Sequence, residues 1–264
     1  MKKLLFGFIS IFFIASACRA NNNPCGHVNL EWFESHAGMP ESAEIIYKKK
    51  IGTLCETVLM IQGDPVSFYC SKDFFIQGQM FKDKKSLTNE TFKSIEPLIL
   101  AKRKNYVESE VKRTEQRKLF FKKNIKELDS MVSFQFGAKN YNRVIYFITD
   151  PNCSHCKKML KVLGELSIKK GFLVKTVIAP ILGEKSLNLG YRAVCKNFGY
   201  NEYKNLKDDG NPYICEKAVL LFKREKEFFK RADLNFVPFI IDGKGKWVVE
   251  GGNPELLKKK LASD

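Results

Sequence analysis

The spacing of hydrophobic and polar residues changes several times along this chain, and each spacing predicts a different kind of element. Two short apolar runs, residues 57–61 and 66–70, are separated by the turn signal Gln62-Gly63-Asp64-Pro65, which indicates a β-hairpin. Residues 39–50 have a spacing typical of a helix. We therefore expect a small α+β unit over residues 21–88.

A third run in that unit, residues 74–81, is unusually apolar for an exposed strand. A short antiparallel sheet buries little apolar surface by itself, so an apolar edge favours pairing with a second copy of the chain. No cluster of titratable residues is visible here. We interpret the unit as an assembly module.

Residues 89–131 have helical spacing and many charges. The apolar positions stop after Val111, are absent from 112–118 and resume at Phe120. A helix that loses its buried face for two turns is typical of a solvent-bridging connector, so we expect a helical linker here. A core helix of one continuous domain is the alternative.

The rest of the chain, residues 132–264, alternates strand and helix patterns and predicts a second unit. Strands are expected at 132–136, 144–148, 172–179, 236–242 and 246–249, with a helix after the second strand, a polar helical stretch over 184–230 and a closing helix at 254–262.

Residues 1–20 resemble a secretory signal, with Lys2 and Lys3, an apolar core and the small-residue exit Ala15-Ser16-Ala17. Cleavage after Ala17 would leave Cys18 first, as in a lipoprotein anchored through that cysteine. Cleavage after Ala20 would give a soluble protein, which we favour. Either way we expect export to the periplasm.

The formal net charge of +16 would favour a nucleic-acid partner in a cytosolic protein. An exported chain does not meet nucleic acid, so we expect none. The basic residues are interpreted as a solvated surface, with attraction to anionic lipids or acidic client proteins left open.

The candidate chemistry lies in Cys153-Ser154-His155-Cys156, between a strand pattern and an amphipathic helix pattern. A cysteine at a helix N-terminus is favoured as the thiolate, and a second cysteine one turn later can close a disulfide with it. His155 adds a polar or cationic neighbour that stabilises the thiolate. The motif predicts a redox-active pair, with a plain structural disulfide as the alternative.

Other uses of this motif fit less well. A zinc site needs a second close pair of ligands, which the spacing of the remaining cysteines and histidines does not provide. A haem attachment site needs histidine where Lys157 stands. We expect no metal and no cofactor.

In an oxidising compartment the other cysteines are expected to pair. Cys55 and Cys70 flank the predicted hairpin, and Cys195 and Cys215 bracket a polar loop, so we predict these two disulfides. Cys25 is then left over. Other connectivities stay open, because spacing alone does not prove a pairing.

Taken together, these residues resemble the DsbC/DsbG family of periplasmic disulfide isomerases. The resemblance rests on residues 147–156 with the redox motif, on Cys195 with Cys215, on Val237-Pro238, and on residues 57–59 and 75–80, the last similar to the family's dimerisation strand.

The resemblance implies an α+β fold: a cystatin-like dimerisation domain, a helical linker and a thioredoxin-like domain with a helical insertion. Cys153 would be the nucleophile and Cys156 the resolving thiol. Val237 and a cis Pro238 would shape a client groove, and Cys195–Cys215 would be structural. The expected protein is a homodimeric isomerase that acts on misfolded or cysteine-containing exported proteins. An inner-membrane redox partner would restore the redox state of its motif.

Three features depart from that family. Val237 stands where these isomerases usually carry threonine, and Ser154-His155 is more similar to the motif of the oxidase DsbA. The linker is also longer than usual. A dimeric DsbA-like oxidase is therefore one alternative, and a holdase chaperone that binds unfolded clients is another.

Overall fold

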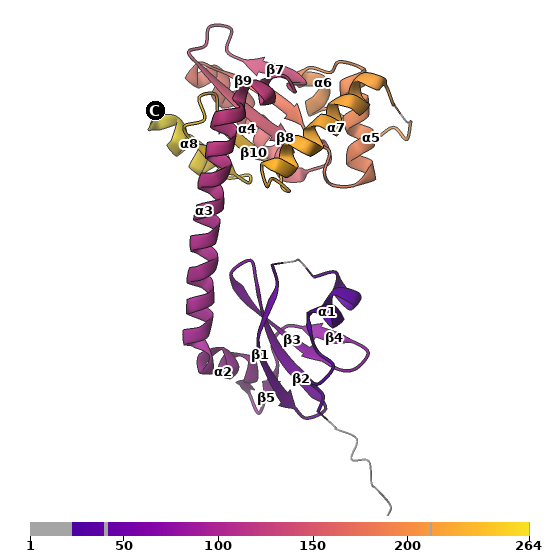
Figure 1. Cartoon of the computed structure of the whole chain (residues 1–264), viewed down its shortest axis with the longest axis vertical. Coiled ribbons are helices and arrows are strands. Elements are labelled where there is room, and N and C mark those ends of the chain that lie inside the picture. Colours follow the sequence, from indigo (N-terminus) through magenta and orange to yellow (C-terminus); the bar gives the residue numbers. More distant parts are fainter. Residues whose placement is uncertain (1–22, 40–41, 212, 264) are drawn as a thin grey trace, which may run out of the picture. The chain divides into compact units, whose positions relative to one another are not determined.

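The computed structural model describes residues 23–39, 42–211 and 213–263. The predicted signal peptide and Cys18 lie outside the described residues. The chain forms two compact units that divide between Ser109 and Glu110, inside one long helix (Figure 1). The expected borders after residues 88 and 131 stay predictions. Within the described part, none of the helices has the length and apolar character of a membrane span.

The first unit is built on a four-stranded antiparallel sheet. Its strands lie in the order β1-β2-β3-β4, with bounds Glu44–Ile51, Leu54–Ile61, Asp64–Cys70 and Phe75–Gln77. Gln62 and Gly63 both have positive φ at the turn between β2 and β3, as a tight two-residue hairpin loop requires. The predicted hairpin is confirmed.

The helix expected over residues 39–50 is wrong. That stretch contributes β1, and the helix of this region, α1 (Leu30–Ala37), comes earlier and is capped by Asn29. β1 carries a register irregularity between Ile45 and Tyr47. An extra residue in a strand breaks the alternation of inward and outward side chains, so the apolar spacing no longer has a period of two.

The two faces of this sheet are buried by different elements. Phe33 of α1 packs in the same core as Cys55, Leu59 and Phe68 on one face. On the other face the buried Glu56 accepts hydrogen bonds from Tyr69 and from Thr91 of α2 (Leu87–Ser94). Both faces of β2 are therefore buried, and the face that carries Glu56 holds this polar group among the buried apolar side chains of Val58 and Met60.

The disulfide predicted between Cys55 and Cys70 is wrong, although these residues lie directly opposite each other on β2 and β3. Cys55 is bonded to Cys25, with 4.9 Å between their Cα atoms, and Cys70 is a buried free thiol. The segment before α1 returns over the sheet and brings Cys25 into the core. That return is a tertiary contact, which spacing in the sequence does not reveal.

Between the first sheet and the second unit, the chain forms two short strands and the long helix α3. β5 (Phe81–Lys82) pairs with β6 (Lys85–Ser86), and α3 runs from Glu96 to Asp129 with non-helical backbone angles at Asn124. Within the first unit, Arg103 of α3 pairs with Asp64 at 2.9 Å. Within the second unit, Arg117 is only 4% exposed, so the solvated face expected over residues 112–118 is wrong at this position.

The second unit is built on a mixed five-stranded sheet in the order β11-β10-β8-β9-β7. The bounds are Phe134–Gly137 for β7, Arg143–Thr149 for β8, Phe172–Ile178 for β9, Phe239–Asp242 for β10 and Val248–Glu250 for β11. β8 and β9 are parallel and are joined by α4 (Ser154–Lys170), whereas the other pairs are antiparallel. This strand order is that of a thioredoxin-like fold.

Helices cover both faces of this sheet (Figure 1). Ile145 and Phe147 of β8 face a core that includes α4 and α8 (Pro254–Ala262), while Tyr146 and Ile148 face a core that includes the end of α3. The insertion between β9 and β10 holds α5 (Glu184–Cys195), α6 (Tyr200–Lys204) and α7 (Glu216–Arg231). A Cys195–Cys215 disulfide closes the loop between α5 and α7.

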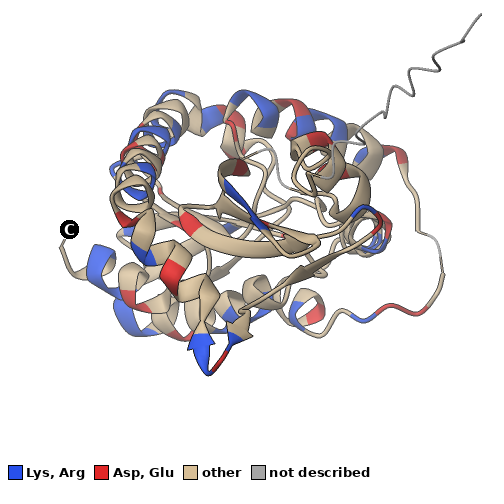
Figure 2. Ribbon diagram, turned by 90° about the horizontal axis from the view of Figure 1, so that it is seen from below, with Lys and Arg blue, Asp and Glu red and all other residues tan. Residues whose placement is uncertain are grey.

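The basic residues do not gather in one stripe. Figure 2 shows Lys and Arg spread over many of the helices, with Asp and Glu interspersed among them. Such a mixed surface is typical of solvated charge.

Candidate redox site

Cys153 is placed by the sharp turn that ends β8 and begins α4. Asn152 donates its backbone N–H to Asp150 Oδ1 at 2.7 Å, and Cys153 donates its own to the Asp150 carbonyl at 3.2 Å. Cys153 is the N-cap of α4, and its sulfur accepts the Cys156 backbone N–H at 3.2 Å. A thiolate at this position is stabilised by that N–H and by the helix N-terminus.

The two sulfurs of the motif differ in their surroundings. Cys153 is 7% exposed, and Cys156, one turn into the helix, is 1% exposed; both are free thiols. Burial raises the pKa of Cys156 well above that of an ordinary thiol, and the charge of the neighbouring Cys153 raises it further. Of the two sulfurs, that of Cys153 is the more exposed.

The predicted groove residues lie beside Cys153. The Val237–Pro238 peptide bond is cis, and the Val237 carbonyl oxygen is 4.0 Å from Cys153 Sγ. Pro238 is held in place because its carbonyl accepts the Gly251 N–H at 2.9 Å. The structure therefore brings together two segments that are 84 residues apart in sequence.

His155 lies in the first turn of α4 and is exposed. A Cβ atom at Gly252 would come within 3.3 Å of His155 Cβ, so the chain after β11 passes close to this side chain. The absence of a side chain at Gly252 leaves room for the imidazole next to the redox motif.

Asp150 is a member of the site that the sequence did not single out. It is 1% exposed, and its carboxylate accepts the backbone N–H groups of Ile181 and Leu182 at 2.8 and 3.0 Å and the Ser186 hydroxyl at 2.8 Å. Its own backbone N–H points to Cys156 Sγ at 3.5 Å. The only sequence feature that could have pointed to Asp150 is its place before Pro151 and the motif, because Ile181, Leu182 and Ser186 are about thirty residues further along the chain.

A second group missed from the sequence is the phenol of Tyr203, on α6. Tyr203 is 6% exposed and packs in the same core as Cys156. Burial raises its pKa well above the ordinary tyrosine value, and charge on Cys156 and Asp150 acts in the same direction. The phenol therefore stays protonated.

The predicted Cys195–Cys215 disulfide is present, and it lies in the insertion between β9 and β10. Cys195 and Cys215 bridge the insertion, with 5.8 Å between their Cα atoms. Among the residues that the structure describes, no three His, Cys, Asp or Glu side chains gather as a metal site.

None of the known family models matches this chain, and none of the curated proteins does. Several solved structures are similar to this chain. The thiol-disulfide exchange protein alpha-DsbA2 of Wolbachia pipientis is 19% identical, over 56% of this chain and 97% of that one, with a TM-score of 0.44. A linker-deletion mutant of Proteus mirabilis ScsC is 14% identical, over 70% and 99%, with a TM-score of 0.48. Helicobacter pylori DsbG is 16% identical, over 80% and 97%, with a TM-score of 0.38.

Proposed function

We propose that this chain is a periplasmic thiol-disulfide oxidoreductase that acts as a homodimeric disulfide isomerase. The observation that carries the proposal is the pair of unequal thiols at the start of α4. Cys153 accepts the Cys156 N–H and faces the Val237 carbonyl, whereas Cys156 is buried behind it.

The reaction begins with the Cys153 thiolate attacking one sulfur of a wrong client disulfide. A mixed disulfide forms between Cys153 and the client, and the other client sulfur leaves as a thiolate. Another client thiolate then attacks the bonded client sulfur, which forms a new client disulfide and releases Cys153 as the thiolate. No net oxidation or reduction occurs in this cycle.

Cys156 provides the escape from a mixed disulfide that finds no client thiol. Its attack releases the client as a dithiol and leaves Cys153 and Cys156 as a disulfide, which an inner-membrane redox partner would reduce again. Because burial raises the pKa of Cys156, little of it is thiolate at neutral pH. A scarce Cys156 thiolate slows this escape and so favours attack by a client thiol.

The groove for the client is assigned to Val237 and Pro238. A client strand beside the Val237 backbone would lie within reach of the Cys153 sulfur, which is 4.0 Å from the Val237 oxygen. Main-chain pairing accepts many sequences, because it uses groups that every residue carries. This fits an enzyme whose clients are misfolded or cysteine-containing exported proteins.

The homodimer is assigned to the first unit, which would be the cystatin-like dimerisation domain. β4 is an edge strand of its sheet, and Phe74, Ile76 and Phe81 are 54%, 56% and 63% exposed. An apolar edge strand left in water is a site for pairing with another chain. The region 89–131 would be the linker between this domain and the catalytic one.

A DsbA-like oxidase is the second candidate, and the surroundings of Cys153 favour it. His155 is exposed in the first turn of α4, where an imidazolium would stabilise the thiolate and so make the Cys153–Cys156 disulfide easier to reduce. An oxidase would work from that disulfide, which a client thiol attacks. A holdase would need neither cysteine.

The deciding experiment uses the full mature chain. Alkylation of whole cells with a thiol-specific reagent should trap Cys153 and Cys156 mostly reduced, and the purified protein should restore activity to a scrambled disulfide protein. A mostly oxidised pair would assign the oxidase. If C153S/C156S suppresses client aggregation and the wild type restores no scrambled protein, the holdase alone remains.

A further inference from the structure

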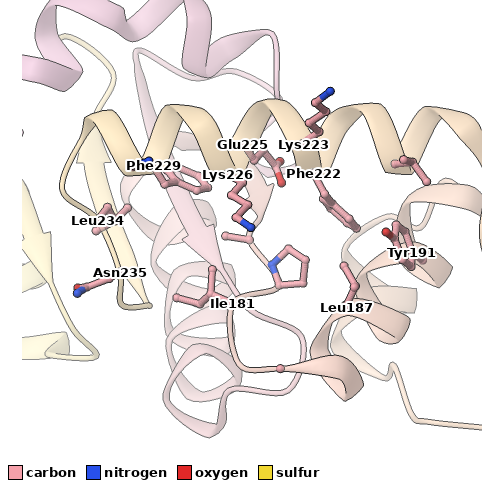
Figure 3. A pocket seen from close by; sticks show the side chains of 15 residues that line it. Ile181, Leu187, Tyr191, Phe222, Lys223, Glu225, Lys226, Phe229, Leu234 and Asn235 are labelled. Carbon is pink, nitrogen blue, oxygen red and sulfur yellow. The ribbon is translucent and has the colours of Figure 1, made fainter. Parts of the chain in front are cut away.

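A large cavity opens in the second unit between α5, α7 and the segment after β9 (Figure 3). Its volume is about 870 Å³, which is in the range of sites for small organic ligands. Most of the lining is apolar, and Figure 3 shows side chains from α5, α7 and both flanking segments turned toward the same space. The apolar lining includes Ile181, Leu187, Tyr191, Phe222, Phe229 and Leu234.

The cavity contains one buried carboxyl group, that of Glu225 on α7. Glu225 is 2% exposed and lines the cavity, and neither of its oxygens has a hydrogen-bond partner among the described residues. Leaving a buried polar group unsatisfied costs free energy, so a native structure normally supplies a partner. In Figure 3 the carboxyl is directed from α7 into the space beside Phe222.

A basic side chain, that of Lys226, lines the same cavity as that carboxyl. Lys226 is exposed, and in Figure 3 its side chain extends from α7 into the cavity. Burial raises the pKa of Glu225 well above that of an ordinary glutamate, which favours its protonated, uncharged form. Glu225 in its protonated form offers an O–H donor and Lys226 an ammonium donor, and in Figure 3 the two lie between Phe229 and Phe222 along α7.

We propose that this cavity binds an amphipathic organic carboxylate, such as a fatty acid. One carboxylate oxygen would accept a hydrogen bond from Glu225, the other would meet the Lys226 ammonium, and the hydrocarbon chain would lie along Phe222 and Leu187. Both donors match a carboxylate, whereas an organic cation would be repelled by Lys226. The ligand gives the buried carboxyl the partner that the protein does not.

This binding site is separate from the proposed redox function and uses none of its reacting atoms. It does share two chain segments with the redox site. Ile181, in its wall, donates its backbone N–H to Asp150, and Leu234 and Asn235 lie three and two residues before Val237.

The charges around Glu225 define the expected pH dependence. The lining contributes Lys223, Lys226 and Lys230 from α7 and Tyr191 from α5, while residues 179–183 and 234–235 contribute no charged side chain. Arg224 on α7 acts on Glu225 in the opposite direction to burial. As pH rises, Glu225 loses its proton and repels a carboxylate, so binding should weaken.

The test is calorimetric titration of the full mature chain with dodecanoate below its micelle concentration, and with dodecylammonium for comparison. We expect one dodecanoate per chain and much weaker binding of the cation. Affinity for dodecanoate should fall as the pH is raised in the wild type, because Glu225 loses its proton, and should not change with pH in E225Q, whose amide donates at every pH.

Two further variants separate this site from a general attraction to a basic protein. K226Q should weaken binding about tenfold, the effect expected for one charge-assisted contact. K169Q, which removes an exposed lysine outside the cavity, should not. L187W should block the hydrocarbon channel. Equal binding of the two amphiphiles, or a fall in affinity with rising pH that persists in E225Q, would overturn the proposal.

Discussion

Ser186 in α5 donates its hydroxyl hydrogen to Asp150 Oδ1 at 2.8 Å, and this bond joins the turn before Cys153 to the start of the helical insertion. The other carboxylate oxygen of Asp150 binds two backbone N–H groups of the same region. One buried side chain therefore fixes the position of α4 relative to the segment after β9.

We expect D150N to lower the free energy of unfolding by about 2–4 kcal/mol, because an amide has only one acceptor oxygen for four donors. The amide N–H₂ would face at least one N–H or O–H donor in a buried site. Urea unfolding followed by circular dichroism measures the loss.

S186A is the matched control for that change, because it removes a single donor and leaves the carboxylate in place. It should cost about 1 kcal/mol. A D150N protein as stable as the wild type would mean that the four hydrogen bonds contribute little.

Cys70 is expected to be chemically silent in the native chain. Burial raises its pKa to about 11, so its thiolate is scarce at pH 8 and increases only as the pH approaches that value. Native iodoacetamide labelling of Cys70, followed by mass spectrometry, should be slow and should rise about tenfold per pH unit beyond pH 9, where an ordinary thiol levels off.

Free glutathione in the same tube provides the reference thiol. If Cys70 were labelled as fast as glutathione at pH 8, its burial would be disproved. Peptide mapping without reduction should find Cys25 linked to Cys55. A Cys55–Cys70 peptide would contradict the connectivity seen here.

The parts of the redox site that are local in sequence could be predicted from the sequence. Cys153 and Cys156 are one helical turn apart, and the strand and helix patterns on either side place them at a helix start. The role of Asp150 could not be predicted, because its carboxylate accepts hydrogen bonds from Ile181 and Ser186, which only folding brings close to it.

In the first unit, too, local features could be predicted from the sequence and tertiary contacts could not. A two-residue turn is a local property, so the hairpin at Gln62-Gly63 was predictable. The Cys25–Cys55 bond was not, because Cys70 also lies directly across the sheet from Cys55 and only the return of the chain before α1 selects between them. The strand at Glu44–Ile51 was missed because its irregular register hides the alternation.

Arg117 should be a stabilising residue of the second unit. Its guanidinium is 3.2 Å from a carboxylate oxygen of Glu250, 3.3 Å from one of Asp233 and 5.1 Å from the ring centre of Phe236. R117A removes the packing of a buried side chain and its hydrogen bonds to Glu250 and to the carbonyl and carboxylate of Asp233, so it should lower the free energy of unfolding by about 3 kcal/mol.

R113A provides the comparison one turn earlier on α3. Arg113 is 42% exposed and pairs with Glu110 on the same helix, so its loss should change stability by about 0.5 kcal/mol or less. Chemical unfolding of the two variants side by side gives the difference. Equal effects would mean that the burial of Arg117 has no energetic consequence.

Ile76 tests whether the proposed dimer uses the edge of the first sheet. Its side chain is 56% exposed on β4, so a lysine there has room in a single chain and costs the fold little. In an interface between two copies, however, I76K would place two charges close together in an apolar contact. Sedimentation velocity should therefore show dimers for the wild type and monomers for I76K.

I168K is the control variant. It changes an isoleucine that is 67% exposed on α4, in the other unit, and should remain dimeric. A dimer that persists in I76K, or a wild-type chain that is monomeric at every concentration, would remove β4 from the assembly.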